Sequence, residues 1–144
     1  MKAFLLAAGK GTRLMPLSYS IPKCLVPIKG KPLLQIWLEM LNDYGVNKVL
    51  INTHHFAAKI VQYIKEHPVK GLEVILFHEP ELLGSAGTVL ANRAFIEESE
   101  PFYIIYCDNL TNINLNDFFS FHKRKRGIFS MCLFNSSDPQ ECGM

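Results

Sequence analysis

Five short apolar runs have the length and composition of β-strands. They lie at residues 2–7, 48–53, 72–77, 102–107 and 128–134. Each run is rich in aliphatic or aromatic residues and is bounded by glycine, proline or polar residues, a pattern typical of strands. Because the runs are nearly continuous rather than alternating, they predict strands that are buried on both faces of a sheet.

Helical periodicity fills the intervals between these runs. Between residues 33 and 44 the apolar positions recur at helical spacing, with Pro32 placed for the first turn and Gly45 just past the end. The side-chain oxygen of Asn114 can cap another helix by accepting from the backbone N–H of residue 116 or 117. Together these signals predict helices at residues 33–44, 56–67, 88–95 and 114–125.

Strands and helices alternate along the whole chain, which predicts a doubly wound, mostly parallel, Rossmann-like α/β sheet. No internal repeat or linker interrupts the pattern, so we expect residues 1–144 to belong to one domain. Ligands of such sheets bind at the carboxyl ends of the strands. This rule directs attention to the loops that follow Ala7, Thr53, Phe77 and Cys107.

The composition is that of a folded, water-soluble protein. Of the 144 residues 49% are hydrophobic and 19% are charged, no apolar run approaches the ~20 residues of a membrane span, and no signal peptide is recognisable. We therefore expect a cytoplasmic protein that does not enter a membrane. The four cysteines and five histidines lack metal-ligand spacing, so neither a zinc site nor a disulfide scaffold is indicated. Cys107 lies inside an apolar run and is expected to be a buried thiol. The histidines are expected to be structural, and contact with a base or ribose is the alternative.

Positive charge is concentrated at the start of the chain. The first 38 residues hold six lysines and arginines and no acid, so they carry +6 against a net charge of +2, and the remaining residues carry −4. A local positive field suits an anionic partner such as a polyphosphate. A nucleic-acid-binding protein would more often spread its basic residues over a face with exposed aromatic side chains, so we expect no nucleic-acid partner.

The loop after the first run, residues 7–16, has the composition of a phosphate-binding loop. Gly9 and Gly11 let the backbone approach phosphate oxygens, and Arg13 with its neighbour Lys10 can add charge-assisted hydrogen bonds. The alternative is a tight turn without a ligand. A dinucleotide-binding fingerprint needs a third glycine where Leu14 stands, so an oxidoreductase of that type is not indicated.

Two further charged residues lie where they could act on phosphates. Lys23 stands between Pro22 and Pro27, on a segment that we expect to be stiff and extended, so that its ammonium is aimed. Asp108 follows the fourth run at the carboxyl edge of the sheet, where one carboxylate facing a phosphate loop suits Mg²⁺. The alternatives are a solvated surface lysine and an aspartate that caps a helix or turn.

These residues, in this order, carry a resemblance to a known family. The segments that resemble the motifs of the sugar-nucleotide nucleotidyltransferases are LAAGKGTRLMPL at 6–17, PKCLVP at 22–27, GKPL at 30–33, EPELLGSAGT at 79–88 and CDN at 107–109. Within this family the pattern is most similar to the mannose-1-phosphate guanylyltransferase-like enzymes. The aspartate of the family usually follows a glycine, where this chain has Cys107.

The resemblance implies a reaction and a role for each residue. The oxygen of a sugar 1-phosphate attacks the α-phosphorus of a nucleoside triphosphate, and pyrophosphate leaves. Such a transfer needs positioning and charge compensation rather than a protein nucleophile. By resemblance Arg13 clamps the triphosphate, Lys23 bridges the α-phosphate and the sugar phosphate, and Asp108 holds Mg²⁺ as the cofactor. The residues that seat the nucleotide are Ala8, Gly9, Gly11, Thr12, Glu79 and Gly84.

Glu79 bears on which base of the nucleoside triphosphate is preferred. By resemblance its segment borders the base, and an ionised carboxylate can accept from the adjacent N1–H and N2–H₂ groups of guanine. We therefore expect GTP to be preferred, CTP to be second, and UTP to be disfavoured because the carbonyls of uracil repel a carboxylate. The alternative is that Glu79 points to solvent and the backbone of Gly84 alone reads the base.

Members of the family continue beyond the end of this chain, with strands that line the sugar pocket and a second acidic metal ligand. We therefore expect residues 1–144 to be the nucleotide-binding part of a nucleotidyltransferase domain, truncated at the C-terminus. We expect little transferase activity from this part alone, and self-association as a homo-oligomer through apolar surface that further strands would cover. The alternative function is a catalytically silent nucleotide-binding or regulatory module of the same fold.

Overall fold

The computed structural model describes residues 1–96 and 100–135. The chain divides into two compact units, Met1–Thr111 and a second unit that begins at Asn112. The first unit holds the sheets and all but one of the described helices, and the second holds the remaining described helix.

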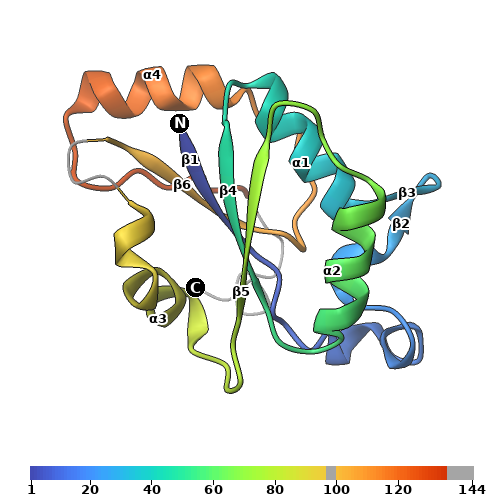
Figure 1. Cartoon of the computed structure of the whole chain (residues 1–144). Helices are drawn as coiled ribbons and strands as arrows, with labels where there is room; N and C mark the ends of the chain where they lie inside the picture. Colours follow the sequence, from blue (N-terminus) through green and yellow to red (C-terminus); the bar gives the residue numbers. More distant parts are fainter. Residues whose placement is uncertain (97–99, 136–144) are drawn as a thin grey trace. The chain divides into compact units, whose positions relative to one another are not determined.

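Four parallel strands form the central sheet of the first unit, in the order β5-β4-β1-β6 (Figure 1). The strands are β1 Lys2–Leu6, β4 Lys48–Thr53, β5 Glu73–His78 and β6 Phe102–Tyr106. Each strand matches an apolar run to within one residue at either end, so four of the five predicted strands are confirmed. In the register of the sheet, Leu6 lies between Asn52 on β4 and Tyr106 on β6.

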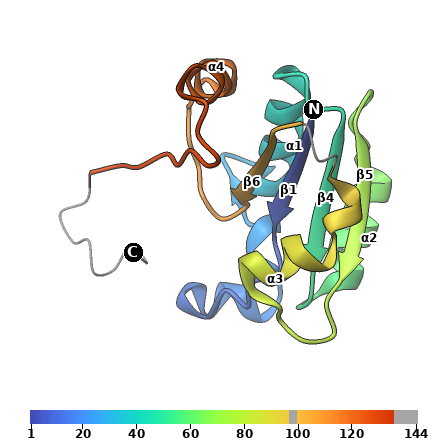
Figure 2. The ribbon, with the colours of Figure 1, turned by 90° about the vertical axis from the view of Figure 1, so that its left-hand side faces the viewer.

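Helices cover both faces of this sheet. α1 Leu33–Asp43 and α2 Ala57–Glu66 lie against one face, and α3 Gly84–Ala91 lies against the other (Figures 1 and 2). A 3-10 turn, Arg93–Phe95, follows α3. The predicted doubly wound α/β architecture is therefore confirmed for this unit, although α3 begins four residues earlier than predicted.

The central strand β1 is deeply buried. Ala3, Phe4 and Leu5 have no exposed surface, as expected for a strand covered on both faces. The ring of Phe4 packs edge-on against Phe95, at 5.1 Å between ring centroids, and against Phe102, at 5.7 Å. These contacts hold β1 in place and with it the loop that leaves its carboxyl end.

The end of α1 follows the signal in the sequence. Gly45 adopts a left-handed backbone with φ of +79°, and its N–H donates to the carbonyl of Asn42 at 2.9 Å. The N–H of Val46 donates to the carbonyl of Leu41 at 2.9 Å, which completes a Schellman motif. Pro32 directly precedes the helix instead of lying in its first turn.

The long connection from β1 to α1 contains short elements that the apolar pattern does not predict. Three 3-10 turns are followed by a small antiparallel hairpin. These elements are Thr12–Leu14, Leu17–Tyr19, Lys23–Leu25, β2 Pro27–Ile28 and β3 Lys31–Pro32. Lys29 and Gly30 at the hairpin tip both have positive φ, which two-residue hairpin turns of type I′ require.

Lys23 therefore does not stand on an extended segment, and that prediction was wrong. Pro22 is extended, with φ −62° and ψ 142°, but the N–H of Leu25 donates to the carbonyl of Pro22 at 2.8 Å and turns the chain. A proline restrains its own φ and the residue before it. The conformation of the residues after it is decided by local hydrogen bonds.

In the second unit, α4 Leu115–Lys125 begins as predicted. The side-chain oxygen of Asn114 accepts from the backbone N–H of Asn116 at 3.0 Å and of Asp117 at 3.2 Å. The last turn is basic, and its positive charge complements the carbonyl end of the helix dipole. Neither α4 nor any other described helix has the length and apolar character needed to cross a membrane.

The predicted fifth strand at residues 128–134 is absent, and this prediction was wrong. Within the described residues the segment pairs with no strand, and Ile128, Phe129 and Phe134 are highly exposed. An apolar run becomes a strand only where a neighbouring strand satisfies its N–H and C=O groups. Apolar composition alone therefore over-predicted the sheet.

Candidate active site

The site predicted from the sequence lies at the carboxyl edge of the sheet, where β1 and β6 are neighbours. The strand order changes direction at this pair, which is where doubly wound sheets bind ligands. The N–H of Cys107 donates to the carbonyl of Leu6 at 3.0 Å and carries the pairing past the end of β6. Asp108 therefore emerges beside the start of the glycine loop, residues 7–11.

A left-handed residue shapes the glycine loop. Gly11 has φ of +65°, and a Cβ there would lie 3.3 Å from the Cβ of Lys23 and 3.4 Å from the Cβ of Ser18. Any larger residue would strain the backbone and crowd Lys23. Ala8 is buried, and the exposed residues that follow it include Gly9, Lys10, Thr12 and Arg13.

Lys23 and Asp108, 85 residues apart in the sequence, form an ion pair. The Nζ of Lys23 lies 2.5 Å from Oδ2 of Asp108, and 26% and 38% of the two side chains remain exposed. A pair this open to solvent contributes about 0–1 kcal/mol to stability, so it does little to hold the fold together. Two of the three residues predicted for catalysis thus meet. Of the alternatives for Asp108, a helix cap and a turn cap, the helix cap is wrong, because Asn114 caps the next α-helix along the chain.

Each residue of this ion pair is next to a buried cysteine in the sequence. Cys24 follows Lys23 and Cys107 precedes Asp108, and only 2% and 1% of the two cysteines are exposed. The hydrogen bond with Cys24, together with burial, raises the pKa of the Cys107 thiol well above its usual range. Cys107 is therefore a neutral packing residue, which confirms the expectation of a buried thiol.

Glu79 has a different role from the predicted one. It has no exposed surface. Its Oε1 accepts from Nδ2 of Asn52 at 2.9 Å and from Oγ1 of Thr88 at 2.5 Å, and its Oε2 accepts from the N–H of Leu83 at 3.1 Å. A buried carboxylate whose oxygens are both occupied cannot pair with the edge of guanine, so the predicted base contact is wrong. The alternative, a carboxylate that points to solvent, is wrong as well.

Asn52 is the residue near the site that the sequence analysis missed. It lies near the end of β4, where its Oδ1 accepts from the N–H of Ala7 at 2.7 Å. Its Nδ2 also donates to Oγ1 of Thr88 at 3.2 Å. An amide within an otherwise apolar strand is the signal that could have found it, because a buried amide needs hydrogen-bond partners.

The second nucleotide segment predicted from the sequence leads into α3 at Gly84, which has φ of +70°. The carbonyl of Gly84 lies 3.0 Å from Oγ1 of Thr88, whose one proton goes to the nearer Oε1 of Glu79 at 2.5 Å. The hydroxyl of Ser85 lies 2.8 Å from that of Tyr106, the last residue of β6. The first turn of α3 is therefore tied to the strand that leads to Asp108.

Opposing effects set the charge of Glu79. Burial raises the pKa of its carboxyl, but hydrogen bonds from Thr88, Asn52 and Leu83, with help from nearby His54, outweigh burial and hold the pKa below its usual value. Nδ1 of His54 lies 2.8 Å from the Glu79 carbonyl, which can only accept, so this nitrogen carries a proton. Glu79 is therefore a buried, charged group held mainly by neutral donors.

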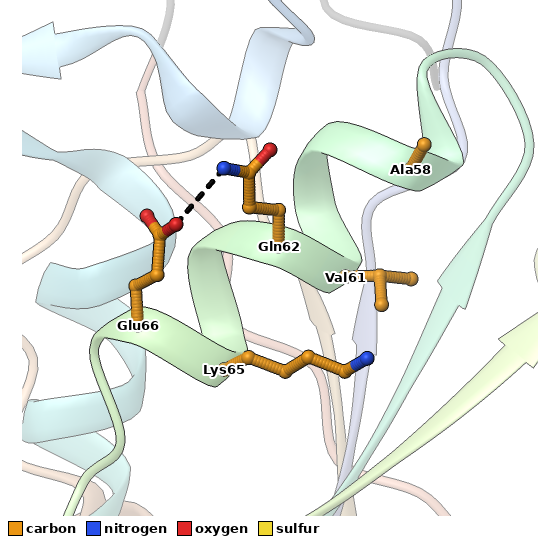
Figure 3. A pocket seen from close by; sticks show the side chains of 5 residues that line it. All are labelled: Ala58, Val61, Gln62, Lys65 and Glu66. Atoms are coloured by element: carbon orange, nitrogen blue, oxygen red, sulfur yellow. Dashed lines mark hydrogen bonds between the residues drawn. The ribbon is translucent and has the colours of Figure 1, made fainter.

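A hollow beside α2 is not a comparable site (Figure 3). All of its lining residues come from one helix, and they are Ala58, Val61, Gln62, Lys65 and Glu66. The amide of Gln62 donates to Glu66 at 2.9 Å, so these two polar groups pair with each other. At the carboxyl edge of the sheet, by contrast, residues from separate elements come together.

The sequence matches known proteins along almost its whole length. Residues 2–144 match the family model described as nucleotidyl transferase. The mannose-1-phosphate guanyltransferase beta-B of Xenopus laevis is 33% identical over the whole chain, and the UTP–glucose-1-phosphate uridylyltransferase of Synechocystis is 30% identical over 98% of it. These matches cover 41% and 38% of the two relatives, so the chain spans about two fifths of their length.

Solved structures share the arrangement of elements. The crystal structure of HddC from Yersinia pseudotuberculosis complexed with GMP-PN matches with a TM-score of 0.73 at 32% identity, over 84% of this chain and 53% of that one. A UDP-glucose pyrophosphorylase complexed with UDP-glucose, 24% identical, has the same fold with a TM-score of 0.71 over 87% of this chain and 54% of that one. The predicted fold class is therefore confirmed.

We predict that Glu79→Gln lowers stability at neutral pH and removes part of the acid sensitivity of the protein. Because folding lowers the pKa of Glu79, its contribution is complete above the usual pKa of glutamate and is lost as the pH falls toward the lowered value. The amide nitrogen of the new glutamine is a donor, and it must face either Nδ2 of Asn52 or the N–H of Leu83, which are donors too. This mismatch is expected to lower the free energy of unfolding by about 1–3 kcal/mol.

Urea unfolding from neutral to acidic pH measures both effects. Glu81→Gln changes an exposed carboxyl of the same segment and serves as the matched control. If acid lowers the stability of Glu79→Gln as much as that of the wild type, the lowered pKa of Glu79 makes no contribution.

Proposed function

Since this chain belongs to the nucleotidyl transferase family, we propose that residues 1–144 are the nucleotide-binding part of an enzyme that joins a nucleoside triphosphate to a sugar 1-phosphate. The products are an NDP-sugar and pyrophosphate. The observation that carries the proposal is the meeting of Lys23 and Asp108 beside the glycine loop, at the edge where parallel sheets bind ligands.

In this reaction the sugar phosphate oxygen attacks the α-phosphorus, the bond to the β-phosphate oxygen breaks, and pyrophosphate departs. The protein holds the substrates in line and compensates charge on the α-phosphate and the leaving group. Arg13, on the exposed 3-10 turn after the glycine loop, clamps the triphosphate and then the pyrophosphate. Lys23 bridges the α-phosphate and the sugar phosphate.

Two backbone segments seat the nucleotide. The second begins at Gly84, and the residues of the first are Ala8, Gly9, Gly11 and Thr12. No atom lies within 4 Å of the position that a Cβ would take at Gly9 or at Gly84. This open space supports the proposal, because it lets a ligand approach the peptide groups closely.

Asp108 suits a magnesium ion that arrives with the triphosphate. Mg²⁺ takes one or two carboxylates, keeps several waters and accepts phosphate oxygens for the rest. Asp108 offers one partly exposed carboxylate, and across residues 1–96 and 100–135 no three His, Cys, Asp or Glu side chains gather to hold an ion by themselves. When bound, the ion neutralises charge on the phosphates.

The ion pair also gives the ligand-free site a way to respond to substrate. Lys23 and Asp108 neutralise each other, and their exposure to solvent keeps the attraction weak. An incoming triphosphate offers Lys23 a more highly charged anion. Release of Lys23 then frees Asp108 for a cation, so nucleotide and Mg²⁺ are expected to bind cooperatively.

The proposed substrates are GTP and mannose 1-phosphate or a similar sugar phosphate. The supporting relatives are the guanyltransferase at 33% identity and the GMP-PN complex at 32% identity, although a protein named as a uridylyltransferase is 30% identical. Because Glu79 is buried, the choice of base falls to the backbone that begins α3 at Gly84.

Lys23→Ala is expected to lower kcat of the full-length protein roughly a hundredfold or more and to change KM for the nucleotide much less, because Lys23 contacts charge that builds in the transition state. The control is Lys48→Ala. It removes another lysine–carboxylate pair, in which Nζ of Lys48 lies 2.9 Å from Oε2 of Glu73 at the amino ends of β4 and β5, and it should keep normal turnover. Steady-state kinetics compare the variants. Wild-type turnover in Lys23→Ala would exclude the assigned role.

Asp108→Asn is expected to abolish the effect of Mg²⁺ on nucleotide affinity. In the wild type, Mg²⁺ should tighten the binding of a non-hydrolysable triphosphate analogue by about tenfold or more, measured by calorimetry. Glu81→Gln, an exposed carboxyl outside the ion pair, should keep that gain. The same magnesium dependence in Asp108→Asn as in the wild type would show that Asp108 holds no ion.

Competition binding tests the choice of base. GTP is expected to bind more tightly than CTP or UTP, and Glu79→Gln should weaken all three without changing their order, because the buried carboxylate touches no base. A preference for UTP in the wild type would overturn the proposed substrate. A changed order of affinities in Glu79→Gln would show that the Glu79 carboxylate contacts the base after all.

A further inference from the structure

The glycine loop and the start of α3, to which the nucleotide is assigned above, are both attached to one buried polar cluster. This cluster consists of Asn52, Glu79 and Thr88, and we call it the hub. These residues are 5%, 0% and 0% exposed. Asn52 comes from β4, Glu79 follows β5 directly, and Thr88 comes from α3. Three separate elements thus contribute one polar side chain each to a site that solvent does not reach.

Hydrogen bonds run through the hub from one segment to the other. At one end the N–H of Ala7 donates to Oδ1 of Asn52 at 2.7 Å, and Nδ2 of Asn52 donates to Oε1 of Glu79 at 2.9 Å. At the other end Oε2 of Glu79 accepts from the N–H of Leu83 at 3.1 Å. The start of the glycine loop and the residue before α3 are therefore held by one amide and one carboxylate.

The chemistry of the groups permits one orientation of the Asn52 amide. The N–H of Ala7 can only donate, so the amide oxygen faces it and the amide nitrogen faces Glu79. The two protons on that nitrogen go to Oε1 of Glu79 and Oγ1 of Thr88. Asn52, Glu79 and Thr88 are all buried, so the loss of a hydrogen bond between them leaves a buried polar group unsatisfied.

The hub also replaces a backbone hydrogen bond at the point where the chain leaves the sheet. The pairing of β1 with β4 ends at Leu6 opposite Asn52, and the next N–H, that of Ala7, is bound by the Asn52 side chain. The position of this N–H sets the direction in which the glycine loop departs.

We propose that Asn52, Glu79 and Thr88 are positioning residues that set the spacing between the glycine loop and the start of α3. The inference rests on the proposed function, because it assigns the nucleotide to these two segments. The hub touches no substrate and acts through the backbone of Ala7 and Leu83. A change in the hub therefore alters nucleotide affinity even though no ligand contact is removed.

Exchange of the amide and the carboxylate tests the proposed arrangement. Asn52→Asp alone sets two buried carboxylates against each other. In Asn52→Asp combined with Glu79→Gln, the new carboxylate at position 52 still accepts from Ala7 and also accepts from the new amide at position 79. The oxygen of that amide can accept from Leu83, so every partner is satisfied again.

We expect Asn52→Asp to raise the Kd of the full-length protein for a triphosphate analogue about tenfold or more, and the double variant to recover most of this loss. Thr88→Val, which keeps the shape of the side chain and loses its hydroxyl, is expected to raise the Kd too and serves if Asn52→Asp fails to fold. Val46→Ala, a buried position ahead of the amino end of β4, is the control for lost stability alone.

Calorimetry at a temperature where circular dichroism shows each variant folded gives the Kd values. A lower Tm with an unchanged Kd is expected for Val46→Ala. An unchanged Kd in folded Thr88→Val, or a double variant that binds as weakly as Asn52→Asp, would overturn the proposal.

Hydrogen exchange without any ligand separates failure of this proposal from failure of the proposed function. Thr88→Val is expected to speed amide exchange in residues 7–14 as well as in residues 80–88, and Val46→Ala is not. Faster exchange confined to residues 80–88 would show that the hub does not couple the segments. If exchange becomes faster in both segments but the protein binds no nucleotide, the coupling through the hub is supported and the proposed function is overturned.

Discussion

The parallel pairing of β1 with β4 on one side and β6 on the other is the constraint on which the candidate site depends. Because all three strands run in the same direction, their carboxyl ends meet at one edge, and Leu6 there lies between Asn52 and Tyr106. A slip of one residue would turn every side chain of a strand to the other face. The same slip would move Asn52 away from Ala7 and Asp108 away from Lys23.

Two carboxylates near this edge have opposite environments, and the difference decides what each can do. Asp108 is partly exposed and is balanced by Lys23, which a phosphate can draw away from it at little cost. Glu79 is fully buried, and neutral donors from Asn52, Thr88 and Leu83 occupy both of its oxygens. Asp108 is thus available to a ligand, whereas Glu79 belongs to the framework that holds the backbone.

The predictable parts of the molecule are those whose signals are local. The run at residues 48–53 predicts β4 because its apolar side chains are buried on both faces of the sheet, and Gly45 predicts the end of α1 because the Schellman turn needs positive φ. The meeting of Lys23 and Asp108 follows from topology, since a parallel sheet gathers the loops of separate strands at one edge.

The features that the sequence analysis missed depend on distant partners or on single hydrogen bonds. The direction of Glu79 is set by Asn52 and Thr88, which lie 27 and 9 residues away, so the segment around Glu79 carries no sign of it. A hydrogen bond between Leu25 and Pro22 turns the chain at Lys23. The apolar run at 128–134 lacks a pairing strand in the described structure, and composition cannot report that.

The most direct test is a map of the backbone amides whose NMR shifts change when a magnesium complex of a GTP analogue is added to this chain. A site between the two backbone segments predicts one group of perturbed amides that titrate together, at Gly9, Gly11, Arg13, Gly84 and Asp108. The amides of Lys48 and Glu73, at the amino ends of their strands, should not change. Perturbation centred on the amino ends of the strands or on the α2 hollow, with the glycine loop unchanged, would contradict the nucleotide site.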